Sequence, residues 1–181
     1  MAPAIAAMLW RCGAVDSAGD ALGSVGVAVV EVGVANGVTS EHLLRTLPGV
    51  RLVGVDIFPE AGQYRQVASL YARYSGRGGR NGTLVRTTSW AAARARDLLR
   101  DGGWDTADVV FLDARKRYED EFDYIAEWLP RVRPGGCLAG HDYSSVYMGI
   151  VEAVLDLVPA GGTLHLAPNH MWLWCMPAQV A

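Results

Sequence analysis

The alternation of short apolar runs with amphipathic segments, which begins at residue 26, constrains the fold more than any other feature of the sequence. The first run, VGVAVVEV (25–32), is rich in β-branched residues and apolar up to its glutamate, as in a strand buried on both faces. Four further strand-like runs follow, at 50–58, 83–88, 107–113 and 137–142. Segments of helical periodicity come after the strand-like runs: one that ends at Pro48-Gly49, then about 60–74, 90–100, 119–130 and 145–158.

Five strand–helix units in series predict a parallel sheet with helices on both faces. Residues 163–168 and 170–176, split by Pro168-Asn169, predict a closing antiparallel hairpin. We therefore expect an α/β fold: a Rossmann-like three-layer α/β/α sandwich with a seven-stranded, mostly parallel sheet and a C-terminal antiparallel hairpin. The chain divides into an N-terminal helix and loop segment, 1–24, which is a candidate lid, and one domain over 25–181.

Polar residues mark the expected starts of three of these helices. Asn36 or Thr39 is placed to cap the first, Ser89 the helix over 90–100, and Ser144 the helix over 145–158, because their side-chain oxygens can accept from the first-turn N–H groups. The run RPGG (133–136) predicts a turn before the fifth strand.

Composition and charge argue against several classes of protein. The 181 residues carry a formal net charge of −3, which leaves no basic footprint for nucleic acid or an anionic membrane surface. No apolar run is long enough for a membrane span, and no charged region precedes the apolar start, as a signal peptide requires. Cys12, Cys137 and Cys175 are too few and too scattered for a disulfide framework and are expected as free thiols. A soluble, cytoplasmic protein is the expectation.

The turn after the first strand, Glu31-Val-Gly33-Val-Ala-Asn-Gly37, is the first candidate site. In open parallel sheets ligands bind outside the carboxyl ends of the strands, and glycines there let the backbone approach a ligand closely. The spacing is G-x-x-x-G, which differs from the G-x-G-x-x-G of dinucleotide-binding folds. Glu31 argues against a phosphate and for a cationic or hydroxyl-bearing ligand. The structural alternative is a plain tight turn.

The second strand ends in Asp56, a carboxylate that can accept hydrogen bonds from both hydroxyls of a ribose. By itself this residue is weak evidence, since Asp also ends strands for structural reasons. The glycine turn and the acidic strand end together indicate a nucleoside-containing cofactor.

At this point the chain resembles the class I S-adenosylmethionine-dependent methyltransferases. The matching segments are VVEVGVANG (29–37), LVGVDIF (52–58), TTSW (87–90), the run from 109 to 143 and the terminal hairpin. The most specific part, LDARKRYED followed by WLP, RPGG and LAGHDY, is similar to the small-molecule group that contains sugar and macrolide O-methyltransferases. The resemblance spans 26–176, so that 25–181 would be the catalytic domain.

The resemblance implies roles for particular residues. The methionine part of S-adenosylmethionine would be lined by Glu31, Gly33, Ala35 and Gly37. Asp56 would hold the ribose, and the adenine would lie between Ile57, Phe58, Ser89 and Trp90. Asp113 would lie near the methionine amino group or a metal. Carboxylates at Glu31 and Asp113 suit a ligand whose sulfonium and ammonium are both cations.

Asp113 and Asp142 end adjacent strands, with His141 beside them. Some relatives bind magnesium at such strand ends, where the ion orients a substrate hydroxyl and lowers its pKa, so Asp113 and Asp142 are candidate metal ligands. His141 is the candidate general base, with Asp113 as its catalytic partner. The alternatives are that Asp113 contacts only the cofactor and that His141 is satisfied by a neighbouring carbonyl.

One position departs from the pattern of these relatives: a histidine in the segment that precedes PGG is replaced by Lys116. The chain either performs that histidine's task in another way or not at all. O-methylation of a small-molecule acceptor is the main hypothesis, without nucleic acid or membrane, and a homodimer that completes each pocket would suit the short chain. The alternatives are a nicotinamide-dependent oxidoreductase and a methyltransferase-like binding module without catalysis.

Overall fold

The computed structural model describes residues 26–47, 49–74, 81–95, 105–158 and 163–177. The expected N-terminal helix and loop segment, 1–24, which is the candidate lid, and Cys12 lie outside these residues. Within the described ranges, none of the helices is long and apolar enough to cross a membrane.

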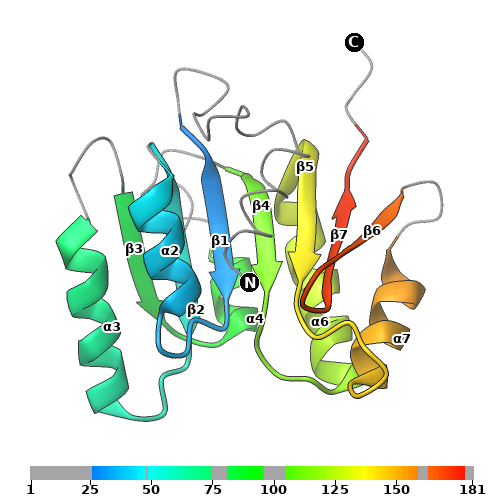
Figure 1. Cartoon of the computed structure of the whole chain (residues 1–181), viewed down its shortest axis with the longest axis horizontal. Coiled ribbons are helices and arrows are strands. Elements are labelled where there is room, and N and C mark those ends of the chain that lie inside the picture. The colour runs from blue at the N-terminus through cyan, green and yellow to red at the C-terminus, as the bar shows by residue number, and fades with distance from the viewer. Residues whose placement is uncertain (1–25, 48, 75–80, 96–104, 159–162, 178–181) are drawn as a thin grey trace.

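A seven-stranded sheet forms the centre of the molecule, in the order β3-β2-β1-β4-β5-β7-β6 (Figure 1). The first five strands in the chain pair in parallel and the last two pair antiparallel, which confirms the predicted sandwich and hairpin. The strands are β1 (Ala28–Val32), β2 (Arg51–Asp56), β3 (Asn81–Arg86), β4 (Ala107–Leu112), β5 (Val132–Gly140), β6 (Leu164–Ala167) and β7 (Met171–Cys175).

Helices cover both faces of the sheet, and successive residues of β1 alternate between them. On one face Val29 packs in a core with Leu43 and Leu44 of α2 (Val38–Thr46) and Val67 of α3 (Ala61–Tyr74). On the other face Val30 and Val32 join a second core, with side chains of the remaining helices. These are α4 (Ser89–Arg94), α6 (Tyr118–Trp128), which continues into the 3₁₀ turn η1 (Leu129–Arg131), and α7 (Met148–Leu157).

The expected helix caps were wrong in detail. The residue before α2 is Gly37, with a left-handed φ of 75°, because the chain must reverse tightly between β1 and the helix. Thr88 caps α4 by accepting from the N–H of Ala91, so Ser89 is the first helical residue. Helix α7 begins only at Met148, because Ser144 first closes a turn with the N–H of Tyr147.

The RPGG segment forms an irregular part of β5 instead of a separate turn. Ala107 pairs with Val132 and Val109 pairs with Cys137, so residues 133–136 bulge out opposite Asp108. The Asp108 carboxylate holds this bulge, because it accepts from Arg133 Nε at 2.5 Å and from the Ala28 N–H at 2.7 Å.

The free-thiol expectation was wrong for two of the three cysteines. Cys137 on β5 lies directly opposite Cys175 on β7, and the two form a disulfide across a Cα–Cα distance of 4.0 Å. The antiparallel return of β7 brings together residues that are 38 apart in the chain, a register that their spacing does not reveal. The cysteines therefore give no support to the expectation of a cytoplasmic location.

Candidate active site

A cavity of about 580 Å³ opens at the carboxyl ends of β1, β2 and β4, the edge at which the sequence placed the site. Its volume is in the range of small-molecule and cofactor sites. It is lined by the ends of β1 and β2, by the loops after β1, β2, β3 and β4, and by residues of α3, α4 and α6. The lining residues are Val32, Gly33, Ala35, Val55, Asp56, Ile57, Pro59, Gln63, Thr87, Thr88, Ser89, Trp90, Asp113, Ala114, Arg115, Asp120, Asp123, Tyr124 and Glu127.

Gly33 lets the loop after β1 pass directly over the end of β4. Its φ is 92°, and a Cβ at this position would lie 2.2 Å from the carbonyl oxygen of Asp113. A side chain is therefore excluded by backbone conformation and by contact. Gly37 serves another purpose, since a Cβ there would meet Val67 and Leu70 at 3.4 Å, and it does not line the cavity.

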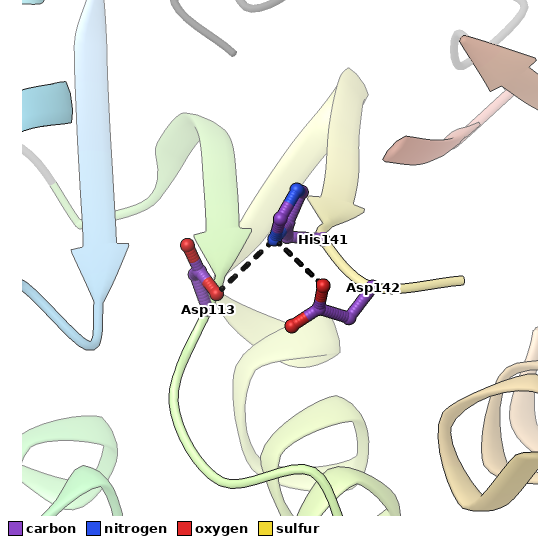
Figure 2. Close-up of side chains that lie close together, drawn as sticks. All are labelled: Asp113, His141 and Asp142. Carbon is purple, nitrogen blue, oxygen red and sulfur yellow. Dashed lines mark ion pairs between the residues drawn. The ribbon is translucent and has the colours of Figure 1, made fainter. Parts of the chain in front are cut away.

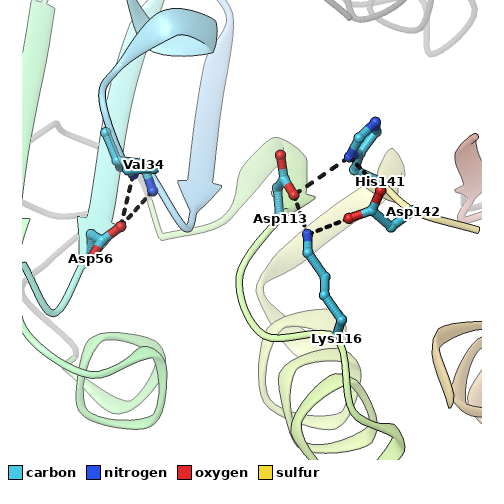
Figure 3. A network of polar contacts seen from close by, with 7 residues as sticks. Val34, Asp56, Asp113, Lys116, His141 and Asp142 are labelled. Carbon is cyan, nitrogen blue, oxygen red and sulfur yellow. Dashed lines mark hydrogen bonds and ion pairs between the residues drawn. The ribbon is translucent and has the colours of Figure 1, made fainter. Parts of the chain in front are cut away.

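The Asp56 carboxylate holds the loop after β1 by accepting hydrogen bonds from backbone N–H groups of that loop (Figure 3). Its Oδ2 accepts from the N–H groups of Val34 and Ala35, both at 2.9 Å, and its Oδ1 accepts from the N–H of Phe58 at 2.9 Å. Each carboxylate oxygen has two lone pairs, so Oδ1 retains one with which to accept a ligand hydroxyl. Asp56 lines the cavity, as expected of a ribose-binding residue.

Glu31 lies outside the cavity, in the layer between the sheet and helices α2 and α3. It is 2% exposed, and its carboxylate accepts from the Ser40 hydroxyl, which in turn lies 2.9 Å from the Tyr71 hydroxyl. Burial raises the pKa of Glu31 to about 8; the Ser40 hydrogen bond opposes this shift, and the charges of Asp113 and Asp56 add to it. The structure therefore does not bring Glu31 to the expected position beside the methionine part of a cofactor.

Three of the four residues expected around an adenine line the cavity. Ile57 and Trp90 are 48% and 55% exposed and line the cavity together with Ser89. The Ser89 hydroxyl accepts from Trp128 Nε1 at 2.8 Å, which ties the start of α4 to α6. Phe58 is fully buried against Tyr64 and does not line the cavity.

A second polar cluster lies beside the cavity, where β4 and β5 end (Figures 2 and 3). Lys116 Nζ lies 2.5 Å from Asp113 Oδ1 and 2.7 Å from Asp142 Oδ2. His141 Nδ1 lies 3.1 Å from Asp142 Oδ1 and 3.6 Å from Asp113 Oδ1. Burial alone would lower the pKa of Lys116, but the hydrogen bonds to Asp113 and Asp142 raise it above its usual value, so the ammonium is charged.

Among the residues that the structure describes, Asp113, His141 and Asp142 form a group of side chains that could hold a metal ion, since one ligand atom from each lies within 4.8 Å of the others. Two carboxylates and an imidazole suit a divalent cation in residue type. The ammonium of Lys116, however, already contacts both carboxylates. The donors therefore fit a divalent ion only after Lys116 has moved away.

His141 lies beside Asp113, but it does not line the cavity itself. Its Nδ1 faces the two carboxylates, and its Nε2 points away from them (Figure 2). Carboxylates beside Nδ1 favour a proton there, which leaves Nε2 as the basic atom. The side chain is 17% exposed.

The sequence analysis missed a set of carboxylates on α6. Asp120, Asp123 and Glu127 line the cavity. Glu121 is 2% exposed, its Oε1 has no hydrogen-bond partner among the described residues, and burial raises its pKa to about 8. The acidic run EDEFD (119–123) could have indicated these carboxylates, but the apolar spacing of 119–130 predicts only a helix.

A methyltransferase domain family matches residues 30–143, which are more than half of the chain. No curated protein matches the sequence. Solved structures with the same fold include CalS11, a TDP-rhamnose 3′-O-methyltransferase of calicheamicin biosynthesis, at 15% identity and a TM-score of 0.68, over 95% of this chain and 77% of that one.

Two further neighbours carry other activities in their names. An rRNA methylase from Streptococcus thermophilus has 16% identity and a TM-score of 0.57, over 96% of this chain and 95% of that one. A precorrin-6y C5,15-methyltransferase from Geobacter metallireducens has 13% identity and a TM-score of 0.58, over 97% and 88%. Because these neighbours differ in acceptor, the shared fold does not determine the acceptor. The family match and the fold confirm the resemblance to class I methyltransferases, and the chain belongs to this methyltransferase domain family.

Proposed function

We propose that the chain transfers a methyl group from S-adenosylmethionine to an oxygen atom of a small molecule. The observation that carries this proposal is the charge of the cavity. Of the charged residues that line it, one is basic, Arg115, and five are acidic: Asp56, Asp113, Asp120, Asp123 and Glu127. A sulfonium and an ammonium are favoured in such a cavity, whereas the pyrophosphate of a dinucleotide is not.

The cavity residues match the parts of this ligand. The free lone pair of Asp56 Oδ1 would accept from a ribose hydroxyl, while Ile57, Ser89 and Trp90 would flank the adenine. The loop at Gly33 and Ala35 would follow the methionine part, with Asp113 near its amino group. Glu31, Gly37 and Phe58 would act indirectly, by fixing the shape of the loops that form the cavity.

Methyl transfer of this kind is an in-line displacement, in which the protein positions two reactants and removes a proton. His141 would accept the proton of the acceptor hydroxyl at Nε2 as the methyl–oxygen bond forms. Asp113 and Asp142 would orient the imidazole through Nδ1 and stabilise the imidazolium. Magnesium binding by Asp113 and Asp142 stays a prediction, and none of these steps depends on it.

A small-molecule acceptor fits better than a nucleic acid, because the five acidic residues that line the cavity would repel a phosphate backbone. Because an rRNA methylase is among the structural neighbours, the exclusion of a nucleic-acid acceptor is a prediction. A homodimer and a cytoplasmic location are also predictions.

Thermal melting with S-adenosylhomocysteine and, separately, NAD⁺ tests the cofactor. At about 100 times the dissociation constant a ligand adds about 2.7 kcal/mol, which for a domain of this size raises Tm by roughly 5–10 °C. We expect this rise with S-adenosylhomocysteine and none with NAD⁺. Formation of S-adenosylhomocysteine from S-adenosylmethionine with a panel of hydroxyl acceptors then tests transfer. Stabilisation by NAD⁺ alone would contradict the proposal, and binding without turnover over a broad panel would favour a binding module.

A further inference from the structure

We propose that the ammonium of Lys116 is a built-in cation, which occupies the position between Asp113 and Asp142 that a divalent metal ion would otherwise take. The protein then holds these two strand ends together without a metal. The binding part of this inference rests on the geometry alone, and its consequence for catalysis rests on the proposed methyl transfer.

The contacts of Lys116 are those of a cation shared between two ligands. Its Nζ lies 2.5 Å from Asp113 Oδ1 and 2.7 Å from Asp142 Oδ2. The two carboxylates come from different strand ends, after β4 and after β5, so the ammonium joins them (Figure 3). All three side chains are largely shielded from solvent, at 29%, 19% and 16% exposure, where charge-assisted hydrogen bonds of this length are strong.

A divalent ion and this ammonium would compete for the same two carboxylates. The candidate metal donors are Asp113, His141 and Asp142, and Lys116 already takes one oxygen from each carboxylate. An ion bound there as well would lie against a positive charge in a poorly solvated place, which is strongly unfavourable. Occupation by Lys116 and occupation by a metal therefore exclude each other.

The same contacts make Lys116 a positioning residue for His141. Asp142 offers Oδ2 to Lys116 and presents Oδ1 to His141 Nδ1 at 3.1 Å. Asp142 also has a left-handed φ of 61°, a strained conformation for this residue that surrounding contacts must maintain. Lys116 thus fixes the carboxylate that orients the imidazole.

Manganese titration followed by electron paramagnetic resonance tests the proposal without any need for turnover, because the signal of free Mn²⁺ falls as the ion binds. We expect no binding by the wild-type protein at millimolar Mn²⁺. Lys116→Met should bind at least about 100-fold more tightly, because a unit charge adjacent to the ion is removed. Lys116→Gln provides a second, polar variant, and circular dichroism confirms that each variant is folded.

Two controls identify the site. Lys116→Met combined with Asp142→Asn should lose the gained binding, and Arg117→Met, which removes an exposed cation from the next position in the loop, should bind no more Mn²⁺ than the wild type.

Two results would overturn the proposal. One is Mn²⁺ binding by the wild type that Asp142→Asn abolishes. The other is the absence of binding in both folded Lys116 variants, since Lys116 then fills no cation site. If turnover is found, a chelator should leave the wild-type rate unchanged, whereas loss of activity with the chelator would contradict the metal-free reaction. A protein without turnover that still shows the Mn²⁺ results would refute the proposed function and leave this inference standing.

Discussion

Two pairs of carboxylates lie towards the same edge of the sheet, and they have different kinds of hydrogen-bond and ion-pair partners. At the ends of β1 and β2, Asp56 accepts hydrogen bonds from three backbone N–H groups, and the buried Glu31 accepts one from the Ser40 hydroxyl. At the ends of β4 and β5, Asp113 and Asp142 share the Lys116 ammonium and face the His141 imidazole. The partners of the first pair are thus backbone N–H groups and one hydroxyl, whereas the partners of the second pair are ionisable side chains.

This difference suggests a division of tasks between the two sides. Backbone partners hold the loops after β1 and β2 in one shape, which suits recognition of the nucleoside part of the proposed cofactor. The side-chain partners at the ends of β4 and β5 are themselves ionisable, which suits the proton transfer of the proposed reaction. Changes at Glu31 and Asp56 should therefore affect folding and cofactor binding, and changes at His141 and Lys116 should affect the rate.

The largest effect on the first side is expected from Gly33→Val. The new side chain would meet the Asp113 carbonyl in a backbone conformation that disfavours it, so we expect a loss of more than about 4 kcal/mol in the free energy of unfolding. Denaturation in urea measures the loss. Gly62→Ala is the matched control: a Cβ there meets nothing within 4 Å, and in a helix it should stabilise by about 0.5–1 kcal/mol. Equal effects of the two substitutions would refute the close approach at Gly33.

On the second side, His141→Gln should lower kcat by roughly 10²–10⁴, the usual contribution of a general base. The affinity for S-adenosylhomocysteine should not change, because His141 does not line the cavity. Calorimetry and steady-state kinetics on the same preparation separate the two quantities. A kcat equal to that of the wild type would show that His141 is not the base.

A smaller effect, on the pH dependence of stability, is expected from the buried carboxyl of Glu31. The pKa of Glu31 is about 8 in the folded protein against an ordinary 4.5, so the folded state retains a proton that the unfolded state releases between these values. The contribution of Glu31 to stability is complete below about pH 4.5 and falls as pH rises towards 8, by at most about 1.4 kcal/mol per pH unit.

Urea denaturation across this pH window measures that decline, which Glu31→Gln should reduce. Glu41→Gln is the control, because the Glu41 side chain is 45% exposed and its ion pair with Arg73 lies on the surface. An unchanged slope in Glu31→Gln would contradict a buried, proton-retaining carboxyl.

Much of this organisation could be predicted from the sequence, and the exceptions have physical causes. The apolar runs determine the parallel sheet, and the strand ends place Asp56 and Asp113 at one cavity. The position of Glu31 was misjudged, although the period of two along a strand puts it on the same side as Val29, towards α2. The Cys137–Cys175 disulfide depends on the register of β7, and the contacts of Lys116 depend on the path of a loop; neither follows from local sequence.

The affinity for S-adenosylhomocysteine of the wild type, Asp56→Ala and Lys116→Met, measured by isothermal titration calorimetry, tests the division of tasks most directly. We predict micromolar binding by the wild type and at least about 100-fold weaker binding by Asp56→Ala, because its two charge-assisted hydrogen bonds to the loop after β1 are lost. Lys116→Met should bind as the wild type does. A folded wild-type protein that does not bind at millimolar ligand, or a Lys116→Met variant as impaired as Asp56→Ala, would contradict this account.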